Sequence, residues 1–209
     1  MPDPQRGAPV EAAVFDVGGV LIDWDPRHLY RKIFDDEAAM ERFLAEVCSH
    51  AWNEQADAGR PIAEITAELC AEHPDKRDLI ESYYARFPEM MKDALHGTVA
   101  LLERLHGTGL PLYVLSNFSA ETFPIARQRF GFFERFRGLV ISGAEGMKKP
   151  DPRIYHLLIE RFALRPAQTL FIDDRADNAQ AAVDAGWQAL RFASPEKLEV
   201  DLQSLGLLA

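Results

Sequence analysis

The sequence has few cysteines and no cysteine pattern that would bind a metal. Among its 209 residues only Cys48 and Cys70 are cysteines, and their spacing matches no zinc site. A small secreted domain held together by several disulfides is therefore disfavoured. We expect two buried thiols in a reducing compartment.

Long hydrophobic runs are also missing. No run approaches the roughly 18 apolar residues that a membrane-spanning helix requires. The first segment, Met1 to Val10, is polar, contains three prolines and lacks the apolar centre of a signal peptide. A cytoplasmic protein is the expectation that follows.

Positive charge is scarce. Lys and Arg number 23 against 33 Asp and Glu, the formal net charge is -10, and no basic cluster stands out. Nucleic-acid binding needs a basic patch, and an acidic surface repels anionic membranes. We expect neither partner. A small anionic metabolite remains a possible partner if the local charge at its binding site is positive. We expect a monomer or a homodimer.

Five apolar runs are placed as the strands of one sheet would be. They are Ala12 to Asp16, Pro111 to Asn117, Gly138 to Ser142, Thr169 to Asp174 and Gln188 to Phe192. Helical stretches separate the last four, and Asp151-Pro152 and Ser194-Pro195 are typical helix starts. This alternation predicts an α/β fold, a doubly wound parallel sheet with helices on both faces.

A long stretch after the first strand interrupts this alternation. Between Trp24 and Leu95 no segment has a convincing strand pattern, and it is too long for an ordinary crossover. Helices are indicated after Asp25-Pro26 and at Glu37 to Ser49, Pro61 to Glu72 and Lys76 to Met91. We therefore predict a helical cap, residues 24–95, inserted into a core made of residues 1–23 and 96–209.

Polar side chains recur where the predicted strands end. They are Asp16, Ser116-Asn117, Lys149 in the loop before Pro150, and Asp173-Asp174. In open α/β sheets, ligands bind outside the carboxyl ends of the strands. Carboxylates gathered there repel one another unless a cation joins them, and oxygen ligands without His or Cys favour Mg²⁺ over Zn²⁺. Carboxylates, a hydroxyl and one ammonium are together typical of phosphoryl transfer.

The four segments around these residues resemble the motifs of the haloacid dehalogenase-like (HAD) hydrolases. They are Phe15-Asp16-Val17-Gly18-Gly19-Val20-Leu21, Leu115-Ser116-Asn117, Lys149-Pro150-Asp151-Pro152 and Phe171-Ile172-Asp173-Asp174. They follow the family's order over about residues 12 to 192. The Asp-x-Gly form of the first motif is most similar to a subgroup that includes apparent sugar-phosphate phosphatases. The resemblance implies a Rossmann-like core with a helical cap.

The resemblance also implies a role for each motif residue. Asp16 would be the nucleophile and would form an aspartyl-phosphate, while Ser116, with Asn117 beside it, and Lys149 would bind the transferring group. Asp16, Asp174 and the backbone carbonyl of Gly18 would hold Mg²⁺, with Asp173 supporting them. The implied activity is Mg²⁺-dependent hydrolysis of a small phosphate monoester, with sugar phosphates among the candidates.

The chain departs from the family at Gly18. Most phosphatases of this family carry a second Asp there, which protonates the leaving oxygen and then activates water, and such catalysis contributes roughly 10²–10⁴-fold. Either the leaving group needs no acid, or another carboxyl replaces it. Asp23 and Asp25, at the root of the cap, are the candidates, although Asp25 is also explained as a helix cap.

Two other functions remain open. A metal-independent 2-haloacid dehalogenase expels halide without a proton, which fits Gly18, but the Asp173-Asp174 pair fits it poorly because it would repel a carboxylate substrate. A catalytically inactive chain that binds a ligand or partner is the third possibility. Beyond the motifs, Asn53 and Gln55 are candidates to contact a sugar hydroxyl, and Asp177-Asn178 to orient Lys149.

Overall fold

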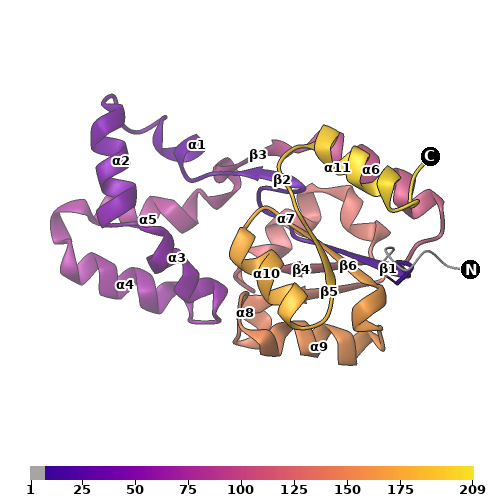
Figure 1. The fold of residues 1–209 in the computed structure, drawn as a ribbon. Coiled ribbons are helices and arrows are strands. Elements are labelled where there is room, and N and C mark those ends of the chain that lie inside the picture. The colour runs from indigo at the N-terminus through magenta and orange to yellow at the C-terminus, as the bar shows by residue number, and fades with distance from the viewer. Residues whose placement is uncertain (1–7) are drawn as a thin grey trace, which may run out of the picture.

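A five-stranded parallel sheet forms the centre of the larger lobe in the computed structural model, which describes residues 8–209 (Figure 1). Its order is β5 (Gly138–Ile141), β4 (Leu112–Ser116), β1 (Ala12–Phe15), β6 (Thr169–Asp173) and β7 (Gln188–Arg191). The doubly wound α/β fold expected from the sequence is confirmed. Residues 1–7 lie outside the described residues. They belong to the expected core and to the segment that lacks the features of a signal peptide.

Helices cover both faces of this sheet because its strands are apolar on both sides. In β1, Ala13 and Phe15 join the core formed with α6 (His96–Gly107) and α11 (Pro195–Ser204). Ala12 and Val14 point the other way, into the core formed with α9 (Pro152–Phe162) and α10 (Ala176–Asp184). Figure 1 shows α6 and α11 above the sheet and α9 below it.

Parallel pairing brings the functional ends of the strands together. Phe15, the last residue of β1, is in register with Val114 of β4 and Ile172 of β6. Asp16 and Asp173 come directly after Phe15 and Ile172, and Ser116 comes two residues after Val114. All three therefore lie at one edge of the sheet, which faces the inserted lobe (Figure 1).

The two helix starts expected from Asx-Pro and Ser-Pro pairs are confirmed. The Asp151 side chain accepts a hydrogen bond from the N–H of Arg153 at the start of α9, and the Ser194 hydroxyl accepts one from Lys197 at the start of α11. Shorter elements complete this lobe: α7 (Phe123–Arg129), α8 (Ser142–Glu145) and the 3-10 turns η3 (Gly131–Arg135) and η4 (Pro166–Gln168).

The inserted lobe is helical, as expected, but its elements differ in detail. They are α1 (Arg27–Tyr30), α2 (Glu37–Glu46), α3 (His50–Asp57), α4 (Ile62–Glu72), η1 (Pro74–Lys76), α5 (Arg77–Ala85) and η2 (Phe87–Met90). The single helix expected over Glu37 to Ser49 ends at Glu46, and α3 was not anticipated. Ser49 instead caps α3, since its hydroxyl accepts the N–H of Trp52.

A small two-stranded antiparallel sheet joins the two lobes and corrects the expectation that this stretch has no strand. Its strands are β2 (Ile22–Trp24) and β3 (Met91–Ala94). Met91 was expected to end a helix. The sequence does not reveal this two-stranded sheet because its strands have three and four residues and no alternating apolar face, as the exposed Lys92 and Asp93 illustrate. The cap limits of 24 and 95 stay a prediction.

Aromatic side chains fill the cap interior. Tyr30 packs on Phe43 with ring centroids 5.1 Å apart, and Trp52 packs on Tyr83 at the same distance. Cys48 and Cys70 are free and buried, as the sequence indicated. Within residues 8–209, no helix is both long enough and apolar enough to cross a bilayer.

Candidate active site

A cavity of about 320 Å³ lies between the carboxyl ends of the strands and the cap. Asp16, Asn117 and Asp174 line it from the core, and Trp24, Asp57 and Phe87 are among the residues that line it from the cap side. The sequence left open whether Trp24, Trp52 and Phe87 line a pocket or pack in the cap; Trp24 and Phe87 line this cavity, and Trp52 packs inside the cap.

Asp16 is held in one orientation by two donors. Its Oδ1 accepts the backbone N–H of Val17 at 2.7 Å and lies 2.9 Å from Nζ of Lys149. Both contacts use Oδ1, so Oδ2 is left to face other groups. The side chain is only 7 % exposed, and it lies at the turn directly after the buried strand β1.

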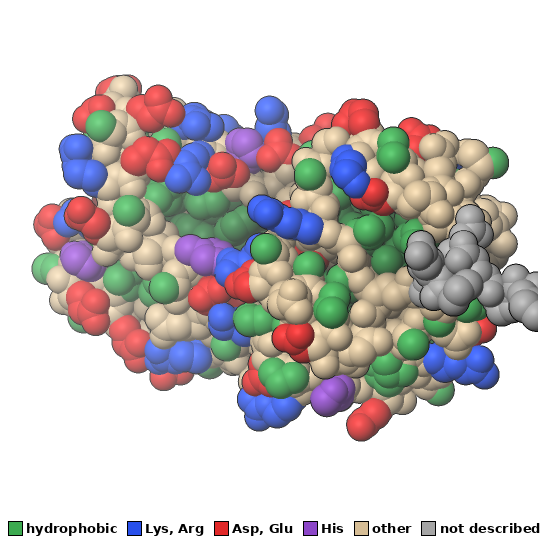
Figure 2. Space-filling view, viewed as in Figure 1, with side chains coloured by type: hydrophobic (Ala, Val, Ile, Leu, Met, Phe, Trp, Pro, Cys, Tyr) green, Lys and Arg blue, Asp and Glu red, His purple; other side chains and the backbone are tan. Residues whose placement is uncertain are grey.

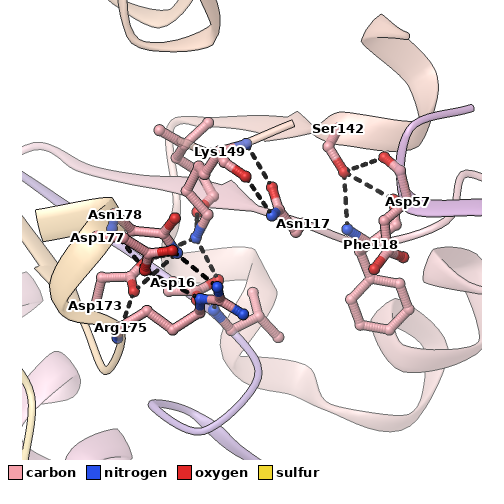
Figure 3. Close-up of polar contacts among 12 residues, drawn as sticks. Asp16, Asp57, Asn117, Phe118, Ser142, Lys149, Asp173, Arg175, Asp177 and Asn178 are labelled. Carbon is pink, nitrogen blue, oxygen red and sulfur yellow. Dashed lines mark hydrogen bonds and ion pairs between the residues drawn. The ribbon is translucent and has the colours of Figure 1, made fainter. Parts of the chain in front are cut away.

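Lys149 is the buried cation of the site. Its Nζ donates to Oδ2 of Asp173 at 2.7 Å and to the Leu115 carbonyl at 2.9 Å. Asp173 is held in turn by Asn178, whose Nδ2 lies 3.1 Å from both carboxylate oxygens, and by the N–H of Arg175 (Figure 3). The expectation that Asp177-Asn178 lies close enough to orient Lys149 agrees with this chain of contacts, in which Asn178 acts through Asp173.

Asn117 clamps the backbone of the same lysine. Its Nδ2 donates to the Lys149 carbonyl at 2.9 Å, and its Oδ1 accepts the Lys149 N–H at 2.8 Å. The loop after β4 therefore fixes the loop before α9. Ser116, one residue earlier, is buried, and its Oγ has no hydrogen-bond partner among the described residues. An unpartnered buried hydroxyl costs free energy unless a ligand accepts or donates there.

We refer to Asp16, Lys149, Asp173 and Asp174 as the core charge cluster. One oxygen from each of its three carboxylates lies within 4.8 Å of the others. Three carboxylates and one ammonium leave two negative charges uncompensated when all are ionised. Burial raises the pKa of Asp16 to about 7, although Lys149 lowers it, and burial together with Asp173 raises the pKa of Asp174. Burial lowers the pKa of Lys149, but Asp16 and Asp173 more than reverse this, so its ammonium stays charged.

The donor set of this cluster fits a hard divalent cation. Carboxylate oxygens at this spacing, without His or Cys, suit Mg²⁺. A cation beside Asp16 would also lower the pKa of that carboxyl and so favour the ionised nucleophile.

The two glycines after Asp16 have different reasons to be glycine. Gly19 has a φ of +72°, and a Cβ there would lie 2.8 Å from Oδ2 of Asp174, so a side chain is excluded twice over. A Cβ at Gly18 would have no atom within 4 Å. The position that holds an acid in most phosphatases of the resembled family is thus open space on the edge of the cavity.

The two expected substitutes for that acid are engaged elsewhere. Asp23 lies 2.8 Å from Nε2 of His28, and Asp25 accepts the N–H of Arg27 at 2.8 Å at the start of α1. Neither carboxyl lines the cavity that Asp16 lines. His28, considered from the sequence as able to face the site, does not line it either.

A buried polar network reaches the cavity from the cap. Tyr84 donates its hydroxyl to Oδ1 of Asn53 at 3.1 Å, and Nδ2 of Asn53 donates to Oδ2 of Asp57 at 3.2 Å. We call Tyr84, Asn53 and Asp57 the cap polar network. Asn53 and Asp57 are both buried and line the cavity. Burial, then Glu54, raises the pKa of Asp57 to about 7, while Lys148 and the N–H of Ser119 lower it and Asp16 raises it further.

Asp57 was missed by sequence reasoning, although a signal exists. It is the last residue of α3, where a negative charge is unfavourable with the helix dipole. That signal is readable only if α3 and its end are known. Gln55, weighed together with Asn53, does not line the cavity and accepts a hydrogen bond from Arg60.

Arg175 borders the cavity without contacting the cluster through its side chain. Its guanidinium pairs with Asp177 at 2.8 Å, and its Nη1 lies 3.0 Å from Nε2 of His50 in the cap. Since a guanidinium only donates, His50 accepts in this contact through Nε2.

Two phosphatases are similar to this chain over most of its length. A sesquiterpene phosphatase (astK) of Aspergillus oryzae is 26% identical over 201 residues, covering 93% of this chain and 96% of that protein. A phosphorylated carbohydrates phosphatase of Thermotoga maritima is 24% identical over 188 residues, 85% of this chain and 82% of that protein.

Solved structures show the same fold. A HAD family enzyme of Bacteroides thetaiotaomicron, crystallised as an Asp→Ala variant with magnesium and inorganic phosphate, superimposes with a TM-score of 0.68 at 22% identity. The match covers 88% of this chain and 95% of that one. The sequence model of the haloacid dehalogenase-like hydrolase family matches residues 10–186, and the chain therefore belongs to the haloacid dehalogenase-like hydrolases.

Proposed function

We propose that this chain is a Mg²⁺-dependent phosphatase that hydrolyses a small phosphate monoester through an aspartyl-phosphate on Asp16. One observation carries the proposal. A buried lysine is shared by two carboxylates, a third carboxylate lies beside them, and an unpartnered serine hydroxyl lies at the end of the neighbouring strand. This arrangement leaves negative charge that a divalent cation neutralises and donors that a phosphoryl group satisfies.

In the first step, Oδ2 of Asp16 attacks phosphorus while Oδ1 stays fixed by Val17 and Lys149. The bond from phosphorus to the ester oxygen breaks, and that oxygen takes up a proton. The Ser116 hydroxyl donates to a phosphoryl oxygen. The positive charge of Lys149, whose three N–H groups are used by Asp16, Asp173 and the Leu115 carbonyl, stabilises the charge that develops on the phosphoryl group. In the second step, water attacks phosphorus, loses a proton and releases phosphate, which restores the Asp16 carboxylate.

The residues proposed to hold Mg²⁺ are Asp16, Asp174 and the carbonyl of Gly18, with Asp173 oriented behind them. When bound, the cation supplies charge neutralisation for the attacking carboxylate and the phosphate. Asp173 has both oxygens engaged by Lys149, Asn178 and Arg175, so its part in this proposal is to position Lys149.

The dehalogenase alternative is disfavoured by the same charges. A 2-haloacid is itself a carboxylate, and without a cation it would approach a cluster with two uncompensated negative charges. The relatives that act as phosphatases support the phosphate ester instead. Mixed charge on the visible face of the molecule, with Lys and Arg scattered among Asp and Glu, also gives no basic field for a polyanion (Figure 2).

The cavity favours a small organic phosphate. Its volume of about 320 Å³ is at the lower end of ligand sites, and Trp24 and Phe87 provide apolar surface beside polar Asn53. A phosphorylated sugar or another small metabolite is the proposed substrate. The cytoplasmic location and the monomeric or dimeric state expected from the sequence stay predictions.

The test offers the purified protein an aryl phosphate, a 2-haloacid and a panel of phosphorylated metabolites. We expect release of phosphate from 4-nitrophenyl phosphate with Mg²⁺ and its loss after a chelator is added. Halide release from 2-chloropropionate in the presence of chelator would instead establish the dehalogenase. Magnesium binding with neither reaction, over a panel of sugar, nucleotide and acyl phosphates, would indicate an inactive binding protein.

A further inference from the structure

We propose that Asp57 of the cap is the proton donor to the leaving oxygen, in place of the acid that position 18 lacks. This inference rests on the phosphatase function proposed above and assigns the one proton transfer that the core leaves without a donor. Gly18 has no side chain, and Asp23 and Asp25 do not line the cavity.

The geometry of in-line attack requires the donor to come from the cap side. Asp16 attacks phosphorus from the strand ends, so the ester oxygen leaves on the opposite side, toward the cavity and the cap. Asp57 lines that cavity from the end of α3. No hydrogen bond joins it to Asp16 among the described residues, and in Figure 3 the two side chains lie on either side of Asn117. Both residues line the same cavity of about 320 Å³, which is the space available to a phosphoryl group.

Contacts between cap and core fix Asp57 in this place. The Ser142 hydroxyl donates to the Asp57 carbonyl at 2.5 Å, and Oγ of Ser142 also accepts the N–H of Phe118 (Figure 3). Two residues further on, a Cβ at Gly59 would lie 3.0 Å from the Gly143 carbonyl, so the chain after α3 rests directly on the core. The carboxyl is therefore positioned by the closed contact of the two lobes.

The other titratable groups at the cap side are already committed. Glu54 forms an ion pair with Lys148, with 3.2 Å between its Oε1 and Nζ of the lysine. His50 accepts from Arg175 and is largely exposed. Tyr84 donates its proton to Asn53.

Asp57 forms no ion pair with any of residues 8–209, and its side chain is only 8 % exposed. Glu54, Lys148, the N–H of Ser119 and Asp16 all act on it, and their balance with burial raises its pKa to about 7. A carboxyl of that pKa carries a proton in a large fraction of molecules at neutral pH, as a general acid must.

After the first step the same group is ionised. It faces the position that the departing alcohol leaves to water, and it can take the proton that the attacking water loses. One carboxyl thereby returns to its starting state over the cycle, and no other proton carrier is needed.

The experiment compares two esters of similar size that differ in their need for an acid. The leaving group of 4-nitrophenyl phosphate is 4-nitrophenolate, which needs no proton. The leaving group of benzyl phosphate is an alkoxide, which needs one. Single-turnover rates are measured with Mg²⁺ for the wild type, Asp57→Asn and Asp35→Asn. Asn keeps the shape of the side chain and can still accept from Asn53, and Asp35 is an exposed cap acid that serves as the matched control.

We expect Asp57→Asn to slow cleavage of benzyl phosphate by about 10²–10⁴-fold and the first turnover of 4-nitrophenyl phosphate by less than about fivefold. Asp35→Asn should change neither. An equal loss on both esters, which a displaced cap would give, or a benzyl phosphate rate within about threefold of the wild type, overturns the assignment. A wild type that cleaves neither ester overturns the phosphatase function itself, and the role of Asp57 with it.

A second variant tests whether Asp57→Asn is slow because it lacks a proton donor or because the cap is displaced. Because a Cβ at Gly18 meets no atom within 4 Å, Gly18→Asp can add a carboxyl at the cavity edge. Combined with Asp57→Asn, it should recover at least about tenfold of the benzyl phosphate rate. A folded double variant no faster than Asp57→Asn alone would show that the loss came from position and would overturn the proposal.

Discussion

Two buried acids on opposite sides of one cavity have opposite surroundings. Asp173 in the core is completely buried, and all its hydrogen-bond capacity is used by Lys149, Asn178 and the N–H of Arg175. Asp57 in the cap is nearly as buried, but within residues 8–209 it receives one hydrogen bond from a side chain, that of Asn53, and forms no ion pair. The same residue type is thus built once as a fixed charge and once as a group whose charge can change.

The difference follows from what buried charge costs. A buried carboxylate is tolerated when cations and N–H donors surround it, and otherwise it keeps its proton. The core charge cluster meets the first condition through Lys149, and the cap polar network meets the second through neutral Asn53 and Tyr84. Charge that must stay in place is therefore on the rigid sheet edge, and the exchangeable proton is on the inserted lobe.

The largest expected effect comes from removing the nucleophile. Asp16→Asn keeps the shape of the side chain and the contact with Val17 but cannot form the aspartyl-phosphate, so kcat should fall by roughly 10⁴-fold or more. Phosphate release from 4-nitrophenyl phosphate measures it, with circular dichroism to confirm the fold. Residual activity above a few per cent of the wild type would remove Asp16 from this role.

Removing the fixed cation should damage stability as well as activity. Lys149→Met fills the same volume but leaves Asp16 and Asp173 together without their shared partner, which typically costs about 3–5 kcal/mol. Chemical denaturation at pH 7 in the presence of chelator measures the free energy of unfolding. Lys32→Met is the matched control, since the Lys32 pair with Glu89 is solvent-exposed and its loss should barely move the unfolding midpoint. Equal shifts for both variants would contradict the contrast.

The cap acid should have the opposite signature with pH. Its pKa is raised to about 7 from an unfolded value near 3.9, so between those values the folded state binds the extra proton and stability falls as pH rises. Asp57→Asn abolishes this loss. The variant should match the wild type near pH 4 and exceed it by at most about 4 kcal/mol at pH 8.

Denaturant unfolding at both pH values measures this effect, and Asp35→Asn is the control. Asp16, whose pKa is also raised to about 7, contributes its own loss in the wild type and in both variants, so the difference between the chains isolates Asp57. A difference that stays constant from pH 4 to pH 8 would mean that Asp57 is already ionised in the folded protein.

The sequence predicts the core of this molecule well because each of its motif strands has a local sequence signal, even though the strands that pair are far apart in the chain. Each strand that contributes a motif is an apolar run ending in a polar residue, and parallel pairing then brings Asp16, Ser116 and Asp173 together without further information. The helix starts at Asp151 and Ser194 are likewise written in two adjacent residues.

The cap is predicted less well, for a physical reason. Its two-stranded sheet has strands of three and four residues, and α1, α4 and α5 begin without a side-chain cap. Aromatic packing between the helices stabilises this lobe, and a single sequence does not report it. The place of Asp57 depends on the Ser142 hydroxyl, 85 residues away in sequence. No local pattern in a single sequence reports such a contact.

The smallest expected effect concerns the acids that the sequence favoured. Asp23 is paired with His28 and Asp25 with the start of α1, so Asp23→Asn combined with Asp25→Asn should leave kcat for benzyl phosphate within about twofold of the wild type. Asn at position 25 still accepts the N–H of Arg27, and thermal unfolding should change by only a few degrees. Single-turnover rates measured beside those of Asp57→Asn decide between the two sides of the cavity. A fall of a hundredfold in the double variant, with Asp57→Asn active, would move the proton donor from α3 to the root of the cap.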